Sequence, residues 1–460
     1  MPIQPLLDAP TAAARMADIA PPYAPQEARI EASRCLFCHD APCITACPTG
    51  IDVPTFIKKI VTDNLAGAAR TILEANVLGA SCARVCPTQV LCEGACVVRG
   101  LEGDPIKIGR LQRHATDHAL ARGLDVLPPS RPRHERRVAV VGAGPAGLGC
   151  AAELARLGYR VTVYDRRPKG GGLNTYGIAY YKMPPEVSLA EVRMIEQRGV
   201  EFRQGLEIGH DVAAADLVRD HDAVFLGIGL GGGRRLGIPG EELPEVVDAV
   251  EFIDWIRTRP LHEVPVGRRV AVIGGGNTAI DAVTQARRLG AESATIIYRR
   301  GAAEMPAYPF EVELAKADGC GFLCDAMPVA VVGDAGHVTG LRLARTVARD
   351  GRVTAVPGSE FTFPCDLVLR AVGQEHVSGR LRDWFPDLAV DAAGRVSHDP
   401  ATMQTNLPML FVGGDCANGG REVVHAVAEG TRAARGIHLQ LTGERIAGPM
   451  QPSRLGAASG

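Results

Sequence analysis

The spacing of apolar residues divides the 460-residue chain into a helical part and a part in which strands and helices alternate. Between residues 56 and 73, apolar side chains recur every three or four positions, which is typical of helices that bury one face. These positions are Phe56, Ile57, Ile60, Val61, Leu65, Ala68, Ala69, Ile72 and Leu73. No strand-like alternation interrupts the pattern, so residues 1–130 are predicted to form a helical domain.

Beyond a proline- and arginine-rich connector at 125–137, short apolar runs are separated by glycine turns and helical segments. Residues 137–165 have the pattern strand, glycine turn, helix, strand, and residues 268–300 repeat it. Further strands are expected at 222–229 and 365–373, with a hairpin turning at Asp350-Gly351. The pattern predicts an α/β protein in which two Rossmann-like nucleotide-binding domains follow the helical domain.

The charge balance argues against two classes of partner. A net charge of −2 offers no concentration of Lys and Arg for nucleic acid or an anionic membrane. No run of about 18 apolar residues occurs, and the N-terminus lacks a basic start followed by an apolar core. We therefore expect a cytoplasmic protein, in a compartment that keeps its thiols reduced.

Eight of the thirteen cysteines fall into two short runs. The first is Cys35-x2-Cys38-x4-Cys43-x3-Cys47-Pro48, and the second is Cys82-x3-Cys86-Pro87-x4-Cys92-x3-Cys96. Ferredoxin-like spacing with a Cys-Pro pair indicates iron–sulfur clusters, in which the last cysteine of a run ligates the other cluster. Structural zinc is the alternative, although a single pair here has the C-x2-C spacing that zinc sites favour.

Gly142, Gly144 and Gly147 form a G-x-G-x-x-G turn between the first predicted strand and helix. Glycines at these places let a pyrophosphate lie against the helix N-terminus. Asp165, at the end of the next strand, is placed to accept a hydrogen bond from a ribose hydroxyl. Because strand, turn, helix and acid occur in order, we interpret this unit as a dinucleotide site.

The second unit has the same turn with alanine in the third place. Its fingerprint residues are Gly274, Gly276, Asn277, Thr278 and Ala279. Arg299 and Arg300 follow its second strand, where an arginine can hold the 2′-phosphate of NADPH, so NADPH is favoured over NADH. The alternative is that both arginines are solvated residues at a strand end.

Two further glycine turns indicate which nucleotide each site takes. Gly171 and Gly172 permit close backbone approach beside the first site. Gly414 and Asp415 precede a helix predicted to start near residue 421, whose N-terminus favours the negative charge of a reduced flavin. We therefore assign FAD to the first site and the nicotinamide coenzyme to the second. The predicted FAD-binding domain has two parts, 135–245 and 374–445, around an NAD(P)H-binding domain at 246–373, with a disordered tail at 446–460.

Together these features resemble the family of FAD-, iron–sulfur- and nicotinamide-binding subunits of bacterial dihydropyrimidine dehydrogenase. The resemblance covers about residues 30–440 and is carried by "CLFCHDAPC", "LGASCARVCPTQVLC", "IGRLQ", "GAGPAG" and "ATMQTN". Small subunits of glutamate synthase share the cysteine spacing, but they tend to have an acid where this chain has Gln112.

The resemblance implies the ligands of two 4Fe-4S clusters. The first cluster would use Cys35, Cys38, Cys43 and Cys96, and the second would use Cys47, Cys86, Cys92 and Gln112. Spacing alone favours Cys82 as the eighth ligand, whereas the family uses a glutamine and leaves the matching cysteine without metal. Replacing a thiolate changes the charge of the cluster, which is one determinant of its potential.

The resemblance also implies an NAD(P)H-dependent oxidoreductase that feeds electrons into pyrimidine catabolism. Its partner would be an FMN- and iron–sulfur-containing large subunit that reduces uracil or thymine, in a hetero-oligomer, and this chain would need no catalytic acid or base. One alternative is the small subunit of a glutamate synthase-type complex, or another NAD(P)H:acceptor flavoprotein. A second alternative is a non-catalytic scaffold that holds zinc.

Overall fold

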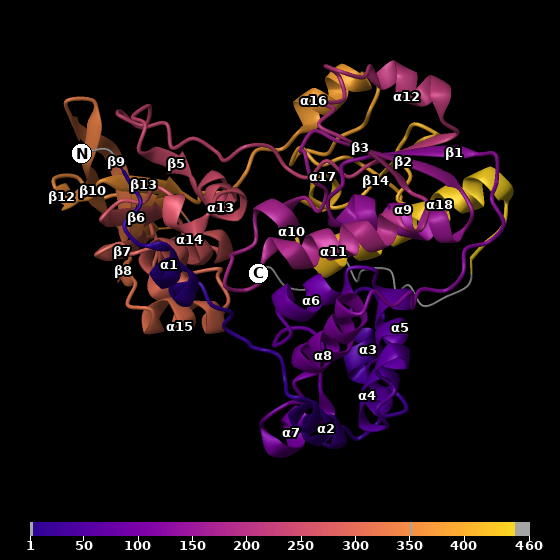
Figure 1. Ribbon diagram of the computed structural model, residues 1–460. Coiled ribbons are helices and arrows are strands. Elements are labelled where there is room, and N and C mark those ends of the chain that lie inside the picture. Colours follow the sequence, from indigo (N-terminus) through magenta and orange to yellow (C-terminus); the bar gives the residue numbers. More distant parts are fainter. Residues whose placement is uncertain (1–2, 350–351, 447–460) are drawn as a thin grey trace. The chain divides into compact units, whose positions relative to one another are not determined.

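The computed structural model describes residues 3–349 and 352–446. The chain forms two compact units, and each contains separate stretches of sequence (Figure 1). Unit 1 consists of the residues up to Ile19, Tyr176–Lys182 and Gly231–Glu375. Unit 2 consists of Ala20–Thr175, Met183–Leu230 and the residues from His376 onward. Within the described residues, every helix is too short or too polar to span a membrane.

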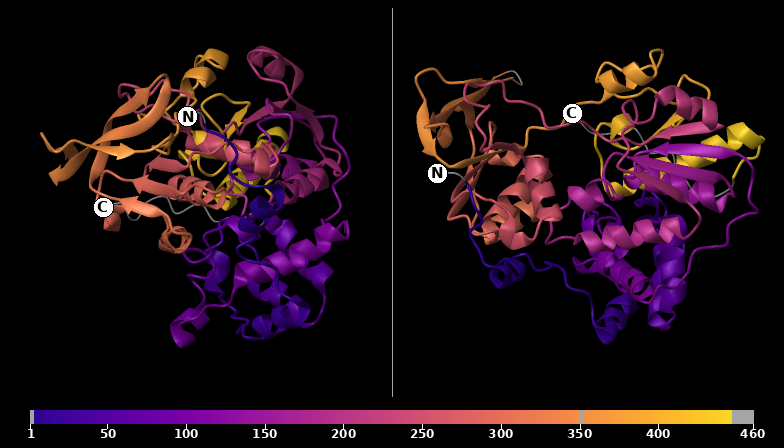
Figure 2. Two further views of the ribbon diagram at one scale, coloured as in Figure 1. Left: turned by 60° about the vertical axis from the view of Figure 1, so that its left-hand side comes forward. Right: turned by 45° about the horizontal axis from the view of Figure 1, so that its top comes forward.

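Unit 2 begins with a bundle of helices, drawn in indigo and purple in Figures 1 and 2. Its helices are α2 (Pro25–Ser33), α3 (Pro42–Thr45), α4 (Val53–Val61), α5 (Leu65–Ala75), α6 (Gly79–Val85), α7 (Val97–Glu102) and α8 (Ile108–Ala121). Asp52 and Asn64 cap α4 and α5, because each side chain accepts a hydrogen bond from a backbone nitrogen of the first turn. The apolar faces predicted from the sequence, including Phe56, Ile57 and Ile72, are buried, which confirms the helical domain.

The rest of unit 2 is built on a parallel five-stranded sheet in the order β14-β4-β1-β2-β3. Its strands are β1 (Arg137–Val141), β2 (Arg160–Asp165), β3 (Glu201–Gln204), β4 (Ala223–Leu226) and β14 (Leu410–Val412). The accompanying helices are α9 (Pro145–Arg156), α10 (Leu173–Tyr176), α11 (Pro185–Glu196), α12 (Ala214–Asp220), α16 (Ser378–Trp384), α17 (Asp415–Asn418) and α18 (Val423–Thr442). Because β14 comes from near the C-terminus and pairs with β4, the sheet is discontinuous in sequence, as predicted.

Helices cover both faces of this sheet, and the two-residue period of β1 explains how. Val138 and Val140 pack in one core cluster with residues of α9 and α18. Ala139 and Val141 point to the opposite face and pack with Leu217 of α12 and with residues of α16. A parallel strand buried on both faces is continuously apolar, which is the pattern that the sequence showed.

Unit 1 contains a second parallel sheet, in the order β5-β13-β6-β7-β8. Its strands are β5 (Val246–Asp248), β6 (Arg269–Ile273), β7 (Ser293–Ile297), β8 (Gly321–Leu323) and β13 (Leu367–Arg370). The helices of unit 1 are α1 (Ala9–Arg15), α13 (Ala249–Thr258), α14 (Asn277–Arg288) and α15 (Pro309–Ala317), with short 3-10 turns at Leu261–Glu263 and Ala302–Glu304. The core of this unit lies between the sheet and α13 and α14.

Unit 1 also carries an antiparallel sheet that the sequence pattern did not predict in full. It comprises β9 (Ala326–Asp334), β10 (His337–Arg349), β11 (Arg352–Ala355) and β12 (Phe361–Pro364), visible as orange strands in Figure 2. β10 and β11 pair as the predicted hairpin requires, although its turn at Asp350-Gly351 lies outside the described residues. The predicted tail from 446 lies outside them as well, apart from Ile446.

The first residues of the chain depart from the predicted helical domain 1–130. Gln4 forms an antiparallel bridge with Val266, and Met16 is buried in the core of unit 1. The glycine turn at Gly290 packs against Leu7 of the same segment. The contacts that tie the N-terminal segment to unit 1 are therefore with residues more than 160 positions away, which a local pattern does not reveal.

Candidate functional site

Four of the predicted ligands line one cavity in the helical part of unit 2. Cys35, Cys38, Cys43 and Cys96 face it together, and its other walls are apolar, among them Ile57 of α4. Thiol side chains converging from separate turns onto an apolar space fit a cubane cluster, which takes one thiolate for each iron. Cys38 is contributed by the turn after Phe37, a residue with a left-handed backbone at φ 51°.

Burial raises the pKa of the Cys43 thiol to about 12, with further increases from Cys96 and Cys35. Burial likewise raises the pKa of Cys35, although a backbone hydrogen bond from Phe37 opposes the shift. Neighbouring thiols with raised pKa values keep their protons until a cation replaces them, so occupation of this cavity by an iron–sulfur cluster releases protons.

A second group of cysteines surrounds Cys86, which follows α6. The pKa of Cys86 is raised well above its ordinary value by a hydrogen bond with Cys82, by burial, and by the thiols of Cys47 and Cys92. Burial raises the pKa of Cys92, with Glu93 and Cys47 adding to the shift. The structure thus brings the three predicted cysteines of the second cluster together, and it places Cys82 with them.

Gln112, the remaining predicted ligand, lies on α8 and is 6% exposed. Its amide nitrogen donates to the carbonyl oxygen of Gly79, the first residue of α6, at 2.7 Å. Cys82 lies on α6 and accepts a hydrogen bond from the Asn76 amide at 3.2 Å. Both candidates for the eighth ligand are therefore held at α6.

No three Cys, His, Asp or Glu side chains in the described part of the chain are arranged to hold a single metal ion. A zinc site needs its ligands at about 2.0–2.3 Å from one ion, whereas a cubane cluster gives each thiolate its own iron.

The first glycine turn is shaped by close backbone approaches. A Cβ atom on Gly147 would stand 1.8 Å from the carbonyl oxygen of Gly142, and one on Gly142, whose φ is 100°, would stand 2.3 Å from that of Gly227. Gly144 immediately precedes α9, so the N-terminus of that helix opens onto the turn. Only glycine permits these close backbone approaches, which give the tight turn and open helix N-terminus that a pyrophosphate binds, so the turn fits the predicted dinucleotide.

The structure brings the other glycines predicted for this site against the same turn. A Cβ on Gly172 would stand 2.6 Å from the Cα of Gly144, and the backbone nitrogen of Gly171 donates to the Ala143 carbonyl at 2.7 Å. From the C-terminal part, a Cβ on Gly414 would stand 2.9 Å from the Cβ of Ala146. Residues from three distant stretches thus meet at the start of α9.

Asp165 supports this turn directly. Its carboxylate accepts hydrogen bonds from the backbone nitrogens of Ala143 at 2.6 Å and Arg167 at 2.7 Å, and burial raises its pKa. Since each carboxylate oxygen has a second lone pair, the ribose contact predicted for Asp165 stays available alongside these bonds.

The C-terminal turn holds a residue that the sequence analysis missed. Glu429 of α18 accepts hydrogen bonds from the Gly414 backbone nitrogen at 2.8 Å and the Asn418 amide at 2.9 Å. Asp415 accepts from the Arg421 backbone nitrogen at 3.3 Å, and burial raises its pKa. A glutamate within the largely apolar run "VVHAVAEG" was the available signal. The helix itself starts at Val423, close to the predicted position.

The second glycine turn belongs to unit 1. Gly274 has φ 139°, and a Cβ there would stand 2.2 Å from the Ala371 carbonyl oxygen. Gly276 precedes α14 with open space around it, and Asn277 starts the helix and accepts a hydrogen bond from the Tyr308 backbone nitrogen at 2.9 Å. Thr278 is exposed. Ala279 is fully buried, which agrees with its expected packing role.

Arg299 and Arg300 follow β7 at the carboxyl end of this sheet. Arg299 is exposed, and its carbonyl oxygen accepts a hydrogen bond from the Thr346 hydroxyl at 2.9 Å. The guanidinium of Arg300 lies 3.9 Å from the carboxylate of Glu304. The guanidinium of Arg299 is thus the more accessible of the two to a phosphate from solvent.

Two family models match the chain. Residues 12–124 match dihydropyrimidine dehydrogenase domain II, 4Fe-4S cluster, and residues 136–430 match pyridine nucleotide-disulphide oxidoreductase. The chain belongs to the pyridine nucleotide-disulphide oxidoreductase family. It is an NAD(P)H-dependent flavin oxidoreductase whose cofactors are FAD, 4Fe-4S clusters and a nicotinamide coenzyme. The 4Fe-4S match favours iron–sulfur clusters over the zinc scaffold.

Members of this family with curated names align over most of the chain. The glutamate synthase (NADPH) small chain of Halomonas elongata is 37% identical over 446 residues, covering 93% of each protein. The NAD-dependent dihydropyrimidine dehydrogenase subunit PreT of Escherichia coli K12 is 36% identical over 413 residues, or 90% of this chain and 94% of PreT. The oxidoreductase AegA of the same strain is 37% identical over 90% of this chain, which spans 66% of the length of AegA.

Among solved structures, FprA of Mycobacterium tuberculosis in complex with NADPH is similar in fold. The TM-score is 0.55 at 23% identity, and the match covers 69% of this chain and 88% of FprA. At this identity the likeness concerns the fold alone. It confirms the predicted α/β class with Rossmann-like domains.

Proposed function

We propose that this chain is the electron-input subunit of a dihydropyrimidine dehydrogenase. It would oxidise NAD(P)H and pass the electrons to an FMN- and iron–sulfur-containing large subunit that reduces uracil or thymine. The chemistry supplied by the bound groups is transfer of a hydride from NAD(P)H to flavin and of single electrons to the two clusters, with the proton released to solvent.

The residues of the chain supply binding and orientation. We assign the flavin pyrophosphate to the turn of Gly142, Gly144 and Gly147, and the coenzyme to the turn of Gly274 and Gly276. The N-termini of α9 and α14 favour the negative charge of the phosphates. Arg299 would take the 2′-phosphate of NADPH, with Arg300 beside it. His425 is no proton donor at neutral pH, because burial lowers its pKa to about 4.

The observation that carries the dihydropyrimidine dehydrogenase assignment is the place of Gln112. Its side chain is buried and held at α6, which also carries Cys82 and leads to Cys86. This is the position at which the family resemblance implies a glutamine ligand, and at which glutamate synthase small subunits tend to have an acid.

A glutamate synthase role is the second candidate, because a small chain of that enzyme is equally similar. To separate the two, the purified chain is mixed with each type of large subunit, and NAD(P)H oxidation is followed with uracil or with glutamine plus 2-oxoglutarate. We expect uracil-dependent oxidation with the FMN subunit. Oxidation that depends on glutamine and 2-oxoglutarate alone would refute the proposal.

A further inference from the structure

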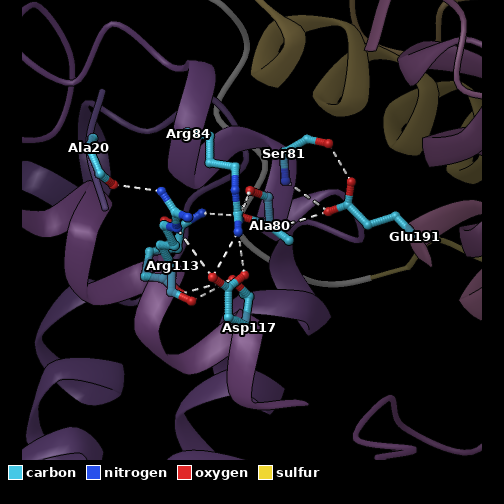
Figure 3. Close-up of polar contacts among 10 residues, drawn as sticks. Ala20, Ala80, Ser81, Arg84, Arg113, Asp117 and Glu191 are labelled. Atoms are coloured by element: carbon cyan, nitrogen blue, oxygen red, sulfur yellow. Dashed lines mark hydrogen bonds and ion pairs between the residues drawn. The ribbon is translucent and has the colours of Figure 1, made fainter. Parts of the chain in front are cut away.

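A buried carboxylate links the flavin side of unit 2 to the second cysteine group. Glu191 of α11 is 0% exposed and accepts hydrogen bonds from the backbone nitrogens of Ala80 at 2.8 Å and Ser81 at 3.0 Å (Figure 3). The Ser81 hydroxyl donates to its other oxygen. Three donors at the first turn of α6 therefore converge on one side chain that is 110 residues away in sequence.

The helix that Glu191 holds positions the candidate ligands of the second cluster. Cys82 lies on α6, Cys86 follows its last residue, and Gln112 binds the carbonyl oxygen of Gly79 at its start. A displacement of α6 would move Cys82 and Cys86 together and would disturb the hydrogen bond from Gln112.

The same helix is fixed from its other side by an ion-pair network. Arg84, whose side chain is 5% exposed, pairs with both carboxylate oxygens of Asp117 at 2.7 Å and donates to the Ala80 carbonyl at 3.1 Å. Arg113 also contacts Asp117, at 3.2 Å, and donates to the Ala20 carbonyl at 2.6 Å (Figure 3). These contacts tie α6 to α8 within the helical bundle, whereas Glu191 ties it to α11.

One turn before Glu191, α11 contacts the turn at residues 170–172, which packs against the Gly142 turn assigned to FAD. The Ser188 hydroxyl lies 2.9 Å from that of Thr175, which donates to the Gly170 carbonyl at 2.7 Å. A Cβ on Gly171 would stand 2.4 Å from the Ser188 hydroxyl oxygen. Residues three apart share a helix face, so one face of α11 contacts both the ligand helix and the turn at residues 170–172 that packs against the flavin turn.

We propose that Glu191 is a positioning residue that fixes α6 relative to the flavin turn, and so sets electron transfer from the flavin to the second cluster. Burying a carboxylate lowers the stability of the fold, because the charged group loses its hydration, and an apolar side chain of similar size would lower it less. This argues that Glu191 serves geometry more than stability. Burial raises its pKa to about 7, while the hydrogen bonds from Ser81 and Ala80 and the charge of Arg84 oppose that shift.

The test uses the holoenzyme with Glu191→Ala and Glu191→Gln. Glu196→Ala is the matched control, because Glu196 is an exposed residue of the same helix. Three quantities are measured: the EPR spectra of the reduced clusters, the rate of flavin reduction by NAD(P)H, and the later transfer of electrons from flavin to clusters. Amide hydrogen exchange over residues 79–86 reports on α6 independently of activity.

We expect Glu191→Ala to alter the EPR signal of one cluster, to speed amide exchange in α6, and to slow flavin-to-cluster transfer by about 10- to 100-fold. Flavin reduction should stay unchanged. Glu191→Gln should restore most of the transfer rate, because its carbonyl oxygen still accepts from both backbone nitrogens.

If Glu191→Ala does not fold, Ser81→Ala removes the hydroxyl contact alone and should shift the same readouts by a smaller amount. Unchanged EPR and transfer in the folded variants, or an equal loss in Glu196→Ala, would overturn the proposal. No partner subunit enters these measurements. A failure of the pyrimidine assignment in the reconstitution assay would therefore be distinguishable from a failure of this inference.

Discussion

Gly147 lies so close to Gly142 that a single methyl group at Gly147 would stand 1.8 Å from the Gly142 carbonyl oxygen. Because that neighbour is backbone, the turn has no flexible side chain that can move aside. Gly147→Ala should therefore displace the turn and abolish retention of FAD, measured by flavin absorbance after gel filtration, while iron and sulfide remain bound.

The control for that change is Gly379→Ala on α16, where a Cβ would meet no atom within 4 Å and the backbone is not left-handed. Helical alanine is more favourable than glycine by about 1 kcal/mol, so this variant should keep its flavin and be at least as stable as the parent. Full flavin content in Gly147→Ala would contradict the assigned site.

Removing a ligand of the first cluster should halve the metal content. Cys43→Ser takes away one of the four thiols that line the cavity, and iron and acid-labile sulfide should fall to about half of the parent values. Cys324→Ser, at a partly buried cysteine of unit 1, should keep both at parent levels. Equal losses in the two variants would indicate general instability in place of ligand loss.

The eighth ligand can be identified by comparing two substitutions. Gln112→Ala should lose or alter the EPR signal of the second cluster, because it removes the oxygen assigned to iron. Cys82→Ala should retain that signal, since the thiol is assigned a place beside the cluster. The reverse result would show that cysteine spacing, and not the family resemblance, identifies the ligand.

Arg299 should matter for NADPH and not for NADH. Losing a charge-assisted contact to the 2′-phosphate should cost about 1 to 3 kcal/mol in kcat/KM for NADPH, with NADH nearly unaffected. The matched control is Arg268→Ala, at an exposed position before β6. It should leave kcat/KM unchanged for both NADPH and NADH. Equal losses with both coenzymes in Arg299→Ala would assign the arginine a role other than phosphate recognition.

The pH dependence of stability should reveal the buried Glu191. Its pKa is about 7 in the folded chain against an ordinary 4.5. The folded chain therefore binds the proton of Glu191 more tightly than the unfolded chain does. The free energy of unfolding should therefore fall, relative to Glu191→Gln, as pH rises from about 4.5 to about 7. The full change is on the order of 3 kcal/mol.

Urea unfolding of both proteins across pH 4.5 to 8 measures this difference. Subtracting the two curves removes the contributions of other titrating groups, because the variants differ at one side chain. A difference that does not vary with pH would contradict the raised pKa.

Local chemistry made much of the site predictable. At positions 142, 147 and 274 another stretch of backbone lies too close to allow a Cβ atom, so only glycine fits. Glycines therefore recur at a fixed spacing, which can be recognised in the sequence. The separation of Cys47 from Cys35, Cys38 and Cys43 followed from the rule that a ferredoxin-like run serves two clusters. The grouping of Cys43 with Cys96, and of Cys47 with Cys86, came from the family resemblance. In the structure Cys43 and Cys96 line one cavity, and Cys47 lies near Cys86.

What escaped prediction depends on distant partners. Glu191 is one of three glutamates in α11 and Glu429 is the one acid in α18, and their roles appear only when Ala80 and Gly414 are folded against them. The bridge from Gln4 to Val266 is hidden from sequence for the same reason. The strand β9 has a partly exposed, irregular pattern that a two-residue period does not single out.

The division of the chain between the units has a practical consequence for dissecting it. The backbone passes from one unit to the other after residues 19, 175, 182, 230 and 375. No single cut can liberate either unit intact, and a fragment starting after the cysteine runs would lack the segment containing Met16, which the core of unit 1 requires. A fragment cut at domain borders that are inferred from the sequence motifs would therefore have a damaged coenzyme-binding unit, although it would keep every glycine of the second glycine turn.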